Sequence, residues 1–366
     1  MLQFAHRPLA YQALPRLACL LIAATLCGVG LAQQSAFEKP KVRQLRDEIR
    51  GASSSGDQVF AWGDEVHIIR ARDLKTQTFG LLRPIGSAGC VTDVNGDGKP
   101  DLIGLEKSDT GPLGNMVWLE SPTFVSQLID THAEFADCLP ATLFGKRGVL
   151  VVHRFSQVRF YEIPAKPREK WPYRELYSIY TPSAQGGLAL ADVDKDGRPD
   201  ILVGNYWLKS PAEADAAWHL FPINQWWNGP RAAMLNVAYA PPLVVAAERE
   251  KSPAKVAWFA PPSTPGPLWT EAPLDVTPPI RKPQALTVAD LNGNGQMDAI
   301  LGENAGDGSR LLVFWRLEDK RYQAAQIDTT EGLLGVWAVK LEGQDRPALI
   351  GVGPRTVSLW KPQRRK

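Results

Sequence analysis

Three short segments of the sequence place oxygen-bearing side chains in one repeated order. They read DVNGDGKPD at 93–101, DVDKDGRPD at 192–200 and DLNGNGQMD at 290–298, and their first residues follow one another at intervals of 99 and 98 residues. Asp or Asn stands at the first, third, fifth and ninth positions, and a glycine follows the fifth. Such hard oxygen ligands on a sharply turned backbone favour Ca²⁺ over Mg²⁺, which requires a regular octahedron, and over Zn²⁺, which prefers nitrogen and sulfur.

The sequence after each loop predicts a strand and not a helix. An EF-hand loop begins similarly but closes with a bidentate Glu at its twelfth position. At that position this chain has Gly104, Val203 and Leu301. The runs DLIGL, DILVGN and DAILGE, which begin at the ninth position, are short and apolar, as is typical of buried strands. Each loop is therefore expected to connect two strands.

The pattern D-x-[DN]-x-[DN]-G-x-x-D followed by an apolar strand resembles the FG-GAP or VCBS repeat of integrin α-subunit propellers and of many exported bacterial proteins. The resemblance covers these three segments. It implies two to three calcium ions and the following ligands: Asp93, Asn95, Asp97, Lys99 (carbonyl) and Asp101; Asp192, Asp194, Asp196, Arg198 (carbonyl) and Asp200; Asp290, Asn292, Asn294, Gln296 (carbonyl) and Asp298. The third loop is expected to bind more weakly because two amides replace carboxylates. The alternative is an Asx-rich turn without metal.

The spacing of the loops predicts the architecture. Propeller blades repeat every 40–50 residues, so an interval near 99 leaves room for one degenerate copy between each pair of loops. GVLVVHR at 148–154 and PLVVAAER at 242–249 stand at those places, and DQVFAWG at 57–63 and PALIGVG at 347–353 extend the series. Equivalent strands then begin near 57, 101, 149, 200, 243, 298 and 348. The sequence predicts an all-β, seven-bladed propeller of four-stranded blades, with calcium loops in blades 2, 4 and 6.

The two ends of the chain have separate expected roles. The apolar run 17–32 follows Arg7 and Arg16, is short for a membrane span, and ends in a small-x-small signal, so 1–32 is interpreted as a signal peptide. An uncleaved anchor is the alternative. Residues 33–366 are expected to form one propeller domain, in which the last repeat does not itself provide an outer strand for the seventh blade. The stretch 39–48 could supply that strand; otherwise 33–50 is a loose arm.

The charge balance and the predicted leader limit the partners. Without the leader's two arginines, the chain has 39 Lys and Arg against 39 Asp and Glu. This balance does not favour a nucleic-acid partner. We expect a secreted or periplasmic protein, monomeric and without stable membrane insertion after cleavage. Millimolar calcium outside the cytoplasm would fill sites of modest affinity.

Two cysteines remain after the leader, Cys90 and Cys138. Their spacing of 48 residues equals that of the strand starts at 101 and 149, so they are expected at equivalent places on innermost strands of neighbouring blades. An oxidising compartment would permit a disulfide. Because a disulfide requires Cα atoms about 4.4–6.8 Å apart and adjacent inner strands are expected to lie farther apart, two buried free thiols are the preferred interpretation.

Catalytic motifs are missing from the sequence. It contains no GxSxG, HExxH, CxxC, Walker loop or GxGxxG, and the histidines after the leader (His67, His132, His153 and His219) are too dispersed to predict a transition-metal site. If a ligand site exists, it is expected where the second and third strands of the blades connect, on the face opposite the calcium loops. The candidate residues there are Glu106, His153, Arg154, Asn205, Trp207, Glu248 and Glu303. Alternatively, these connections are polar because they contact water.

Two classes of function follow from this set. The first is a non-catalytic, calcium-binding scaffold for a protein or glycan, favoured by the missing catalytic motifs. The second is a carbohydrate-active enzyme of the lyase or dehydratase type, with His153 as general base and Arg154, Glu248 and Glu303 as partners. The spacing in WLESP, WLKSP and WFAPP resembles that of propellers attached to such activities. An integrin-like adhesion role is a third alternative. Whether the protein is an enzyme stays open at this point.

Overall fold

The computed structural model describes residues 36–108, 111–153, 157–179, 186–226, 235–317 and 321–363. The chain divides into the units Met1–Ala36 and Phe37–Lys366, and the fold concerns the second unit. The predicted signal peptide 1–32 lies outside the described residues. None of the described residues belongs to a helix long and apolar enough to cross a membrane.

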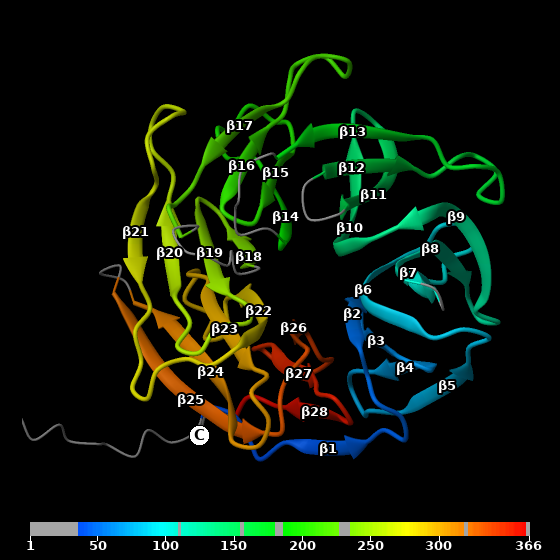
Figure 1. The fold of residues 1–366 in the computed structure, drawn as a ribbon. Helices are drawn as coiled ribbons and strands as arrows, with labels where there is room; N and C mark the ends of the chain where they lie inside the picture. Colours follow the sequence, from blue (N-terminus) through cyan, green and yellow to red (C-terminus); the bar gives the residue numbers. More distant parts are fainter. Residues whose placement is uncertain are drawn as a thin grey trace, which may run out of the picture. The chain divides into compact units, whose positions relative to one another are not determined.

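Seven four-stranded antiparallel sheets form the blades of this unit (Figure 1). Blade 1 contains β2 (Gly51–Ser55), β3 (Gln58–Trp62), β4 (Glu65–Arg70) and β5 (Thr76–Gly80); blade 2 contains β6 (Ile85–Thr92), β7 (Asp101–Ser108), β8 (Gly111–Glu120) and β9 (Val125–Ala133). Blade 3 contains β10 (Phe135–Leu143), β11 (Lys146–His153), β12 (Gln157–Glu162) and β13 (Tyr173–Ser178); blade 4 contains β14 (Leu188–Ala191), β15 (Asp200–Val203), β16 (Tyr206–Lys209) and β17 (His219–Pro222). Blade 5 contains β18 (Leu235–Ala240), β19 (Leu243–Glu248), β20 (Val256–Ala260) and β21 (Thr270–Pro273); blade 6 contains β22 (Pro283–Ala289), β23 (Asp298–Glu303), β24 (Ser309–Arg316) and β25 (Tyr322–Thr330).

Blade 7 closes the ring with a strand from the other end of the sequence. Its strands are β26 (Gly335–Val339), β27 (Ala348–Val352), β28 (Thr356–Trp360) and β1 (Lys41–Gln44). β1 pairs antiparallel with β28, with Lys41 opposite Leu359 and Gln44 opposite Thr356. The first strands of neighbouring blades contact one another around the ring, including β26 with β2. The prediction that 39–48 supplies the missing outer strand is confirmed, and the alternative of a loose arm is wrong.

The core lies between the blades and is built by their second and third strands. All residues of β15, β23 and β27 are buried, because these strands have a neighbouring strand on each side and a neighbouring blade on each face. This explains their continuous apolar runs, which carry no alternation. Third strands also contribute tryptophans to this core: Trp118, Trp207, Trp258 and Trp360 are buried, whereas Trp315 is half-buried.

Cys90 and Cys138 form a disulfide between β6 and β10, the first strands of blades 2 and 3. The expectation of two free thiols is therefore wrong. It assumed that adjacent first strands are too far apart, but the two Cα atoms lie 5.4 Å apart, within the range that a disulfide requires. First strands converge toward the axis of a propeller, and the spacing of blades at that radius could not be read from the sequence.

Candidate functional site

The three predicted calcium loops connect the first and second strands of blades 2, 4 and 6. The glycine after the fifth position has a positive φ in each loop: +83° at Gly98, +83° at Gly197 and +78° at Gly295. The fourth position also has a positive φ in each loop, including +61° at Lys195, where the other loops have glycine. All three loops therefore make the same turn, and a side chain in the second loop does not change it.

The first aspartate of each loop accepts hydrogen bonds from the backbone across the turn. The nitrogen of the sixth residue donates to it in all three copies: Gly98 to Asp93 at 2.9 Å, Gly197 to Asp192 at 3.1 Å and Gly295 to Asp290 at 2.8 Å. The fifth position accepts from the seventh, as in Asp97 from Lys99 at 2.8 Å. These bonds orient several carboxylate and amide oxygens toward the inside of each turn.

The ninth position of each loop ties the turn to the rest of the blade. Asp101, Asp200 and Asp298 are fully buried. One carboxylate oxygen accepts from the second residue of the loop (Val94, Val193 or Leu291) at 3.0–3.2 Å. The other accepts at 2.8 Å from the backbone at the end of the third strand (Ser121, Ser210 or Arg316). Burial raises the pKa of all three carboxyl groups, that of Asp298 to about 6.

The loop of blade 4 has the geometry that a shared cation requires. One ligand oxygen each from Asp192, Asp194 and Asp196 lie within 4.8 Å of one another. Because calcium binds oxygen at about 2.3–2.6 Å, two ligands of one ion lie at most about 5 Å apart. The three carboxylates could therefore hold one metal ion between them.

Blades 2 and 4 differ in the third-strand residue that lies beside the loop. In blade 4 this residue is Lys209, whose ammonium group contacts the carboxylate of Asp194 and lies 3.7 Å from that of Asp196. In blade 2 the equivalent residue is Glu120, which accepts a hydrogen bond from the Asn95 amide at 3.1 Å. The ammonium group of Lys209 would thus compete with a metal ion for the carboxylates of the blade 4 loop. The carboxylate of Glu120 instead adds a negative charge beside the blade 2 loop.

The candidate residues on the other face lie where the sequence placed them but are buried. His153, Asn205, Glu248 and Glu303 lie at or just after the ends of second strands, and Glu106 lies two residues before the end of β7; all five are at most 7% exposed. Trp207 is also buried, and it packs against Phe221 and Trp269 with ring centroids 5.2 and 6.3 Å away. Arg154 lies outside the described residues. The role of this set in ligand binding stays a prediction.

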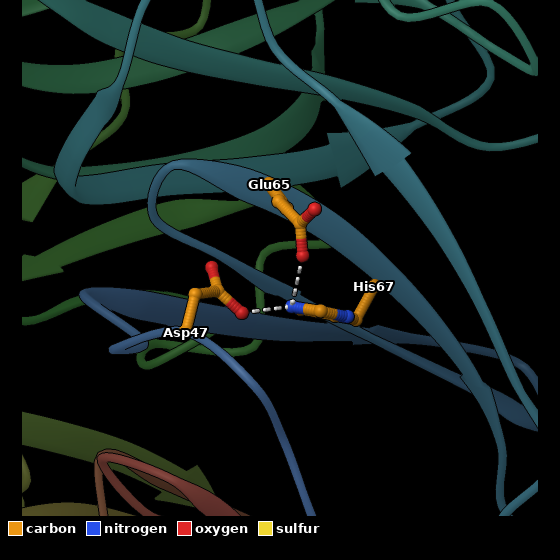
Figure 2. Close-up of side chains that lie close together, drawn as sticks. All are labelled: Asp47, Glu65 and His67. Atoms are coloured by element: carbon orange, nitrogen blue, oxygen red, sulfur yellow. Dashed lines mark hydrogen bonds and ion pairs between the residues drawn. The ribbon is translucent and has the colours of Figure 1, made fainter.

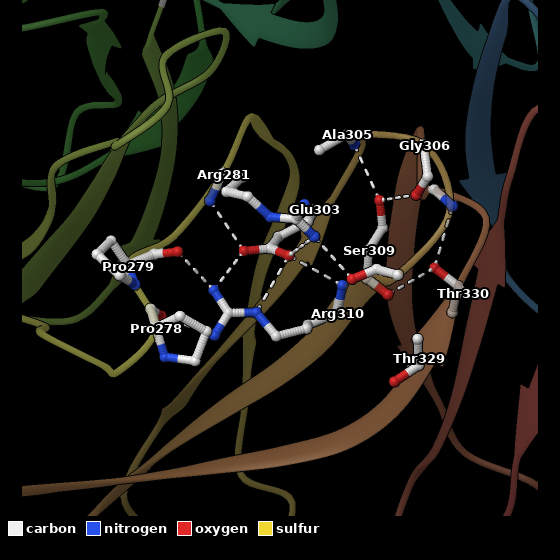
Figure 3. Close-up of polar contacts among 12 residues, drawn as sticks. Pro278, Pro279, Arg281, Glu303, Ala305, Gly306, Ser309, Arg310, Thr329 and Thr330 are labelled. Carbon is white, nitrogen blue, oxygen red and sulfur yellow. Dashed lines mark hydrogen bonds and ion pairs between the residues drawn. The ribbon is translucent and has the colours of Figure 1, made fainter.

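Glu248 and Glu303 use their carboxylates to close the connections that follow them. Glu248 accepts from the backbone nitrogen of Lys255 and Glu303 from that of Arg310, at 2.9 and 3.0 Å, each seven residues further on. The guanidinium of Arg310 also donates to Glu303 and to the carbonyls of Pro278 and Pro279 (Figure 3). Burial alone would raise the pKa of Glu303, but hydrogen bonds from Arg310 and Arg281 lower it. Both glutamates thus hold turns together.

A cavity of about 250 Å³ lies beside the blade 4 loop, between blades 3 and 4. Gly197, Arg198 and Pro199 of the loop form one part of its lining, and Phe144, Trp218 and Thr142 form another. Phe144 has a φ of +49°, unusual for a bulky side chain, and is 36% exposed. Its ring packs edge-on against Trp218 with centroids 6.2 Å apart, and Arg174 lies over its face. The cavity lining therefore combines two aromatic residues, Phe144 and Trp218, with Arg198 of the loop.

The comparisons with known proteins agree with this architecture. The family model described as "FG-GAP repeat" matches residues 185–220. This range includes the loop of blade 4, its strands β14, β15 and β16, and the first two residues of β17. The chain is thus a seven-bladed β-propeller that contains an FG-GAP repeat in blade 4. One solved structure similar to this β-propeller is that of BBS1N in complex with ARL6DN, soaked with mercury. The TM-score is 0.58 at 8% identity, covering 91% of this chain and 98% of that chain, so the likeness concerns the fold alone. No curated protein matches the β-propeller.

Sequence reasoning missed one group of side chains in the β-propeller. Asp47, Glu65 and His67 each place a ligand atom within 4.8 Å of the others (Figure 2). The sequence shows part of this group, because Glu65 and His67 are two residues apart on a strand and so share one face. Asp47 belongs to the segment after β1, and its approach to β4 follows from ring closure alone.

Proposed function

We propose that this β-propeller is an exported, calcium-stabilised scaffold that binds a protein or glycan without catalysing a reaction. The observation that carries the proposal is the position of the blade 4 loop. Its aspartates form the three-carboxylate cluster, and its residues 197–199 line the aromatic cavity. An ion that orders this loop would also order one wall of the cavity. Calcium and ligand binding are thereby expected to support each other.

Calcium would be held by the oxygen ligands of the loops in blades 2, 4 and 6. The ion supplies positive charge among carboxylates that otherwise repel one another, most strongly in the blade 4 loop with its three aspartates. Because the ninth-position aspartates already bond the loop to the third strand, an ordered loop also fixes the edge of its blade. This arrangement supports a role of calcium in stability.

Export is supported by two features that do not depend on the loops. The sequence of 1–32 has the charge and length of a signal peptide. The disulfide between Cys90 and Cys138 is a modification that persists in oxidising compartments. Calcium is also abundant outside the cytoplasm, so modest affinity would suffice there.

The cavity favours a ligand with a flat apolar face and polar edges. Phe144 offers an exposed ring, and Arg198 and Thr142 offer hydrogen-bonding groups beside it. Sugar rings and aromatic side chains of proteins both have this chemistry. The scaffold proposal is further supported by the engaged states of Glu248 and Glu303.

Thermal unfolding in EDTA and in millimolar calcium, repeated with a panel of acidic and neutral polysaccharides and with peptide ligands, tests the proposal. We expect calcium to raise the melting temperature and one ligand class to raise it further. Phe144→Ala should remove the second increase and preserve the first. Leu82→Ala is the matched control, because Leu82 is an apolar side chain 96% exposed and distant in sequence from the cavity lining. A ligand effect that survives Phe144→Ala would contradict the assignment of the ligand site to this cavity. If calcium left the melting temperature unchanged, the prediction that the loops bind calcium would be wrong.

A further inference from the structure

Asp47, Glu65 and His67 bring one nitrogen and two carboxylate ligands together where the ring closes (Figure 2). Glu65 and His67 lie on β4 of blade 1. Asp47 lies in the segment between β1 and β2, whose backbone is fixed to blade 7 by bonds from Leu45 to Arg355 and from Ile49 to Pro354, both 2.8 Å. The group therefore joins blade 1 to the closing segment of blade 7.

The charges in this group do not balance. In the described part of the chain, the recorded ion-pair partner of both carboxylates is His67, whose Nε2 lies 2.5 Å from Asp47 Oδ1 and 3.9 Å from Glu65 Oε2. One imidazole can carry at most one positive charge against two carboxylates. A divalent cation would neutralise the remaining negative charge of Glu65, whose side chain is 36% exposed, beside the buried pair of His67 and Asp47 (2% and 14% exposed).

Hydrogen bonding supports the same conclusion from a second direction. Oδ2 of Asp47 is buried and has no hydrogen-bond partner among the described residues. On the far side of the imidazole, Nδ1 of His67 lies 3.0 Å from Thr78 Oγ1. If Nδ1–H donates to this hydroxyl, the lone pair of Nε2 faces the carboxylates, as in metal-binding histidines whose other nitrogen is fixed by a neighbouring acceptor. Two acceptors facing each other then need a proton or a metal cation between them, and Oδ2 of Asp47 gives a metal ion a further ligand atom.

Small movements of the two carboxylates would give the group the dimensions of a site for a first-row metal ion. Zinc binds imidazole nitrogen at about 2.0–2.1 Å and carboxylate oxygen at about 2.0–2.2 Å, so tetrahedral ligands lie roughly 3.4 Å apart. Asp47 Oδ1, now hydrogen-bonded to Nε2 at 2.5 Å, would have to move away by about 1 Å, and Glu65 Oε2, at 3.9 Å, would have to approach by about half as much. Glu65, whose side chain is 36% exposed, gives the ion and a water ligand access from solvent. The imidazole ligand separates this group from the calcium loops, which offer oxygen only.

We propose that Asp47, Glu65 and His67 bind a divalent transition-metal ion of the zinc type and that this ion fastens the closing segment to blade 1. The site is independent of the calcium loops and of the ligand cavity. Metal binding to the folded protein stabilises it by mass action, and here it does so at the junction on which ring closure depends.

Zinc titration of the chain tests the proposal. The protein is prepared without a polyhistidine tag, and excess CaCl₂ is added so that zinc does not fill the oxygen loops. Calorimetry should give one zinc ion per chain, and Co²⁺ should give a visible absorption band that zinc removes. Zinc should also slow hydrogen exchange in residues 45–50, since Asp47 lies in that segment.

Three variants separate this site from adventitious binding. Glu65→Gln changes a partly exposed side chain and should weaken zinc binding at least tenfold with the fold intact. Thr78→Val should weaken it about 10- to 100-fold by removing the partner of Nδ1. His219→Gln is the matched control, because His219 is an exposed histidine on β17 and should leave binding unchanged. No zinc binding by the parent chain, or binding that Glu65→Gln and Thr78→Val leave unchanged, would overturn the proposal.

Discussion

Glu303 and Arg310 form an ion pair in the interior of blade 6. Nη2 of Arg310 donates to Oε1 of Glu303 at 2.5 Å, and Nε donates to Oε2 at 3.1 Å. The side chains are 0% and 6% exposed. The remaining guanidinium donors bind the carbonyls of Pro278 and Pro279 (Figure 3). The pair thus connects β23 and β24 to the segment that leads into blade 6.

Glu303→Gln should destabilise the protein by about 3–5 kcal/mol, because it leaves a buried guanidinium without its counter-charge. Urea unfolding followed by tryptophan fluorescence measures the change. Glu162→Gln is the control: Glu162 pairs with Lys146 at 3.0 Å, but both side chains contact solvent, so less than about 1 kcal/mol is expected. Equal effects of the two substitutions would show that burial of the Glu303 pair contributes nothing.

The same pair predicts a dependence of stability on pH. Burial opposes ionisation of Glu303, but hydrogen bonds from Arg310 and Arg281 outweigh it, so the pKa lies below the ordinary value of 4.5. A carboxyl whose pKa is lowered by folding contributes stability above its unfolded pKa and loses that contribution as the pH falls through its folded pKa. The difference in unfolding free energy between the parent and Glu303→Gln should therefore be constant at neutral pH and shrink below about pH 4.5. A difference that grows on acidification would contradict this assignment.

Lys209→Met should raise the calcium affinity of the blade 4 loop roughly fivefold, because the ammonium group of Lys209 competes for the carboxylates of Asp194 and Asp196. Calorimetry isolates this loop in a background in which Asp93→Ala and Asp290→Ala remove the first ligand of the other two. Lys195→Met is the matched control, since it removes the same charge from an exposed residue of the same loop. Equal gains from both substitutions would indicate a general charge effect.

Replacing both cysteines of the disulfide with serine should lower stability by about 4 kcal/mol at most, the loop-closure value for a sequence separation of 48. Urea unfolding of the parent with and without reductant gives the same comparison without a substitution. The double variant should be insensitive to reductant. Parent and variant with the same urea midpoint under oxidising conditions would mean that the disulfide does not restrain the unfolded chain.

The repeat of the fold was predictable because each second strand is an apolar run that packs between blades. The predicted starts at 101, 200, 298 and 348 coincide with the first residues of β7, β15 and β23 and with Ala348 of β27. The partner of β28 was also predictable, because six complete blades left one edge open. The regular spacing of the second strands is visible in the sequence, and seven such repeats predict a closed ring of blades.

The details that depend on distances between blades could not be predicted. The Cα separation of Cys90 and Cys138 is set by how closely first strands converge. The sequence shows polar residues at the ends of β19 and β23, but not that Glu248 and Glu303 turn inward to bind a backbone nitrogen seven residues later. His67 was regarded as isolated because its partner Asp47 approaches across a blade boundary.

The pairing of β1 with β28 also sets the order of events during biosynthesis. β1 leaves the ribosome before any blade exists, yet its partner is made only after β27. Blades 1 to 6 can form in sequence as their strands appear, whereas the seventh waits for the last part of the described chain. An interrupted translation product would retain β1 without its partner and leave the ring unsealed, so a proteolytic quality-control system could recognise incomplete chains by this unpaired strand.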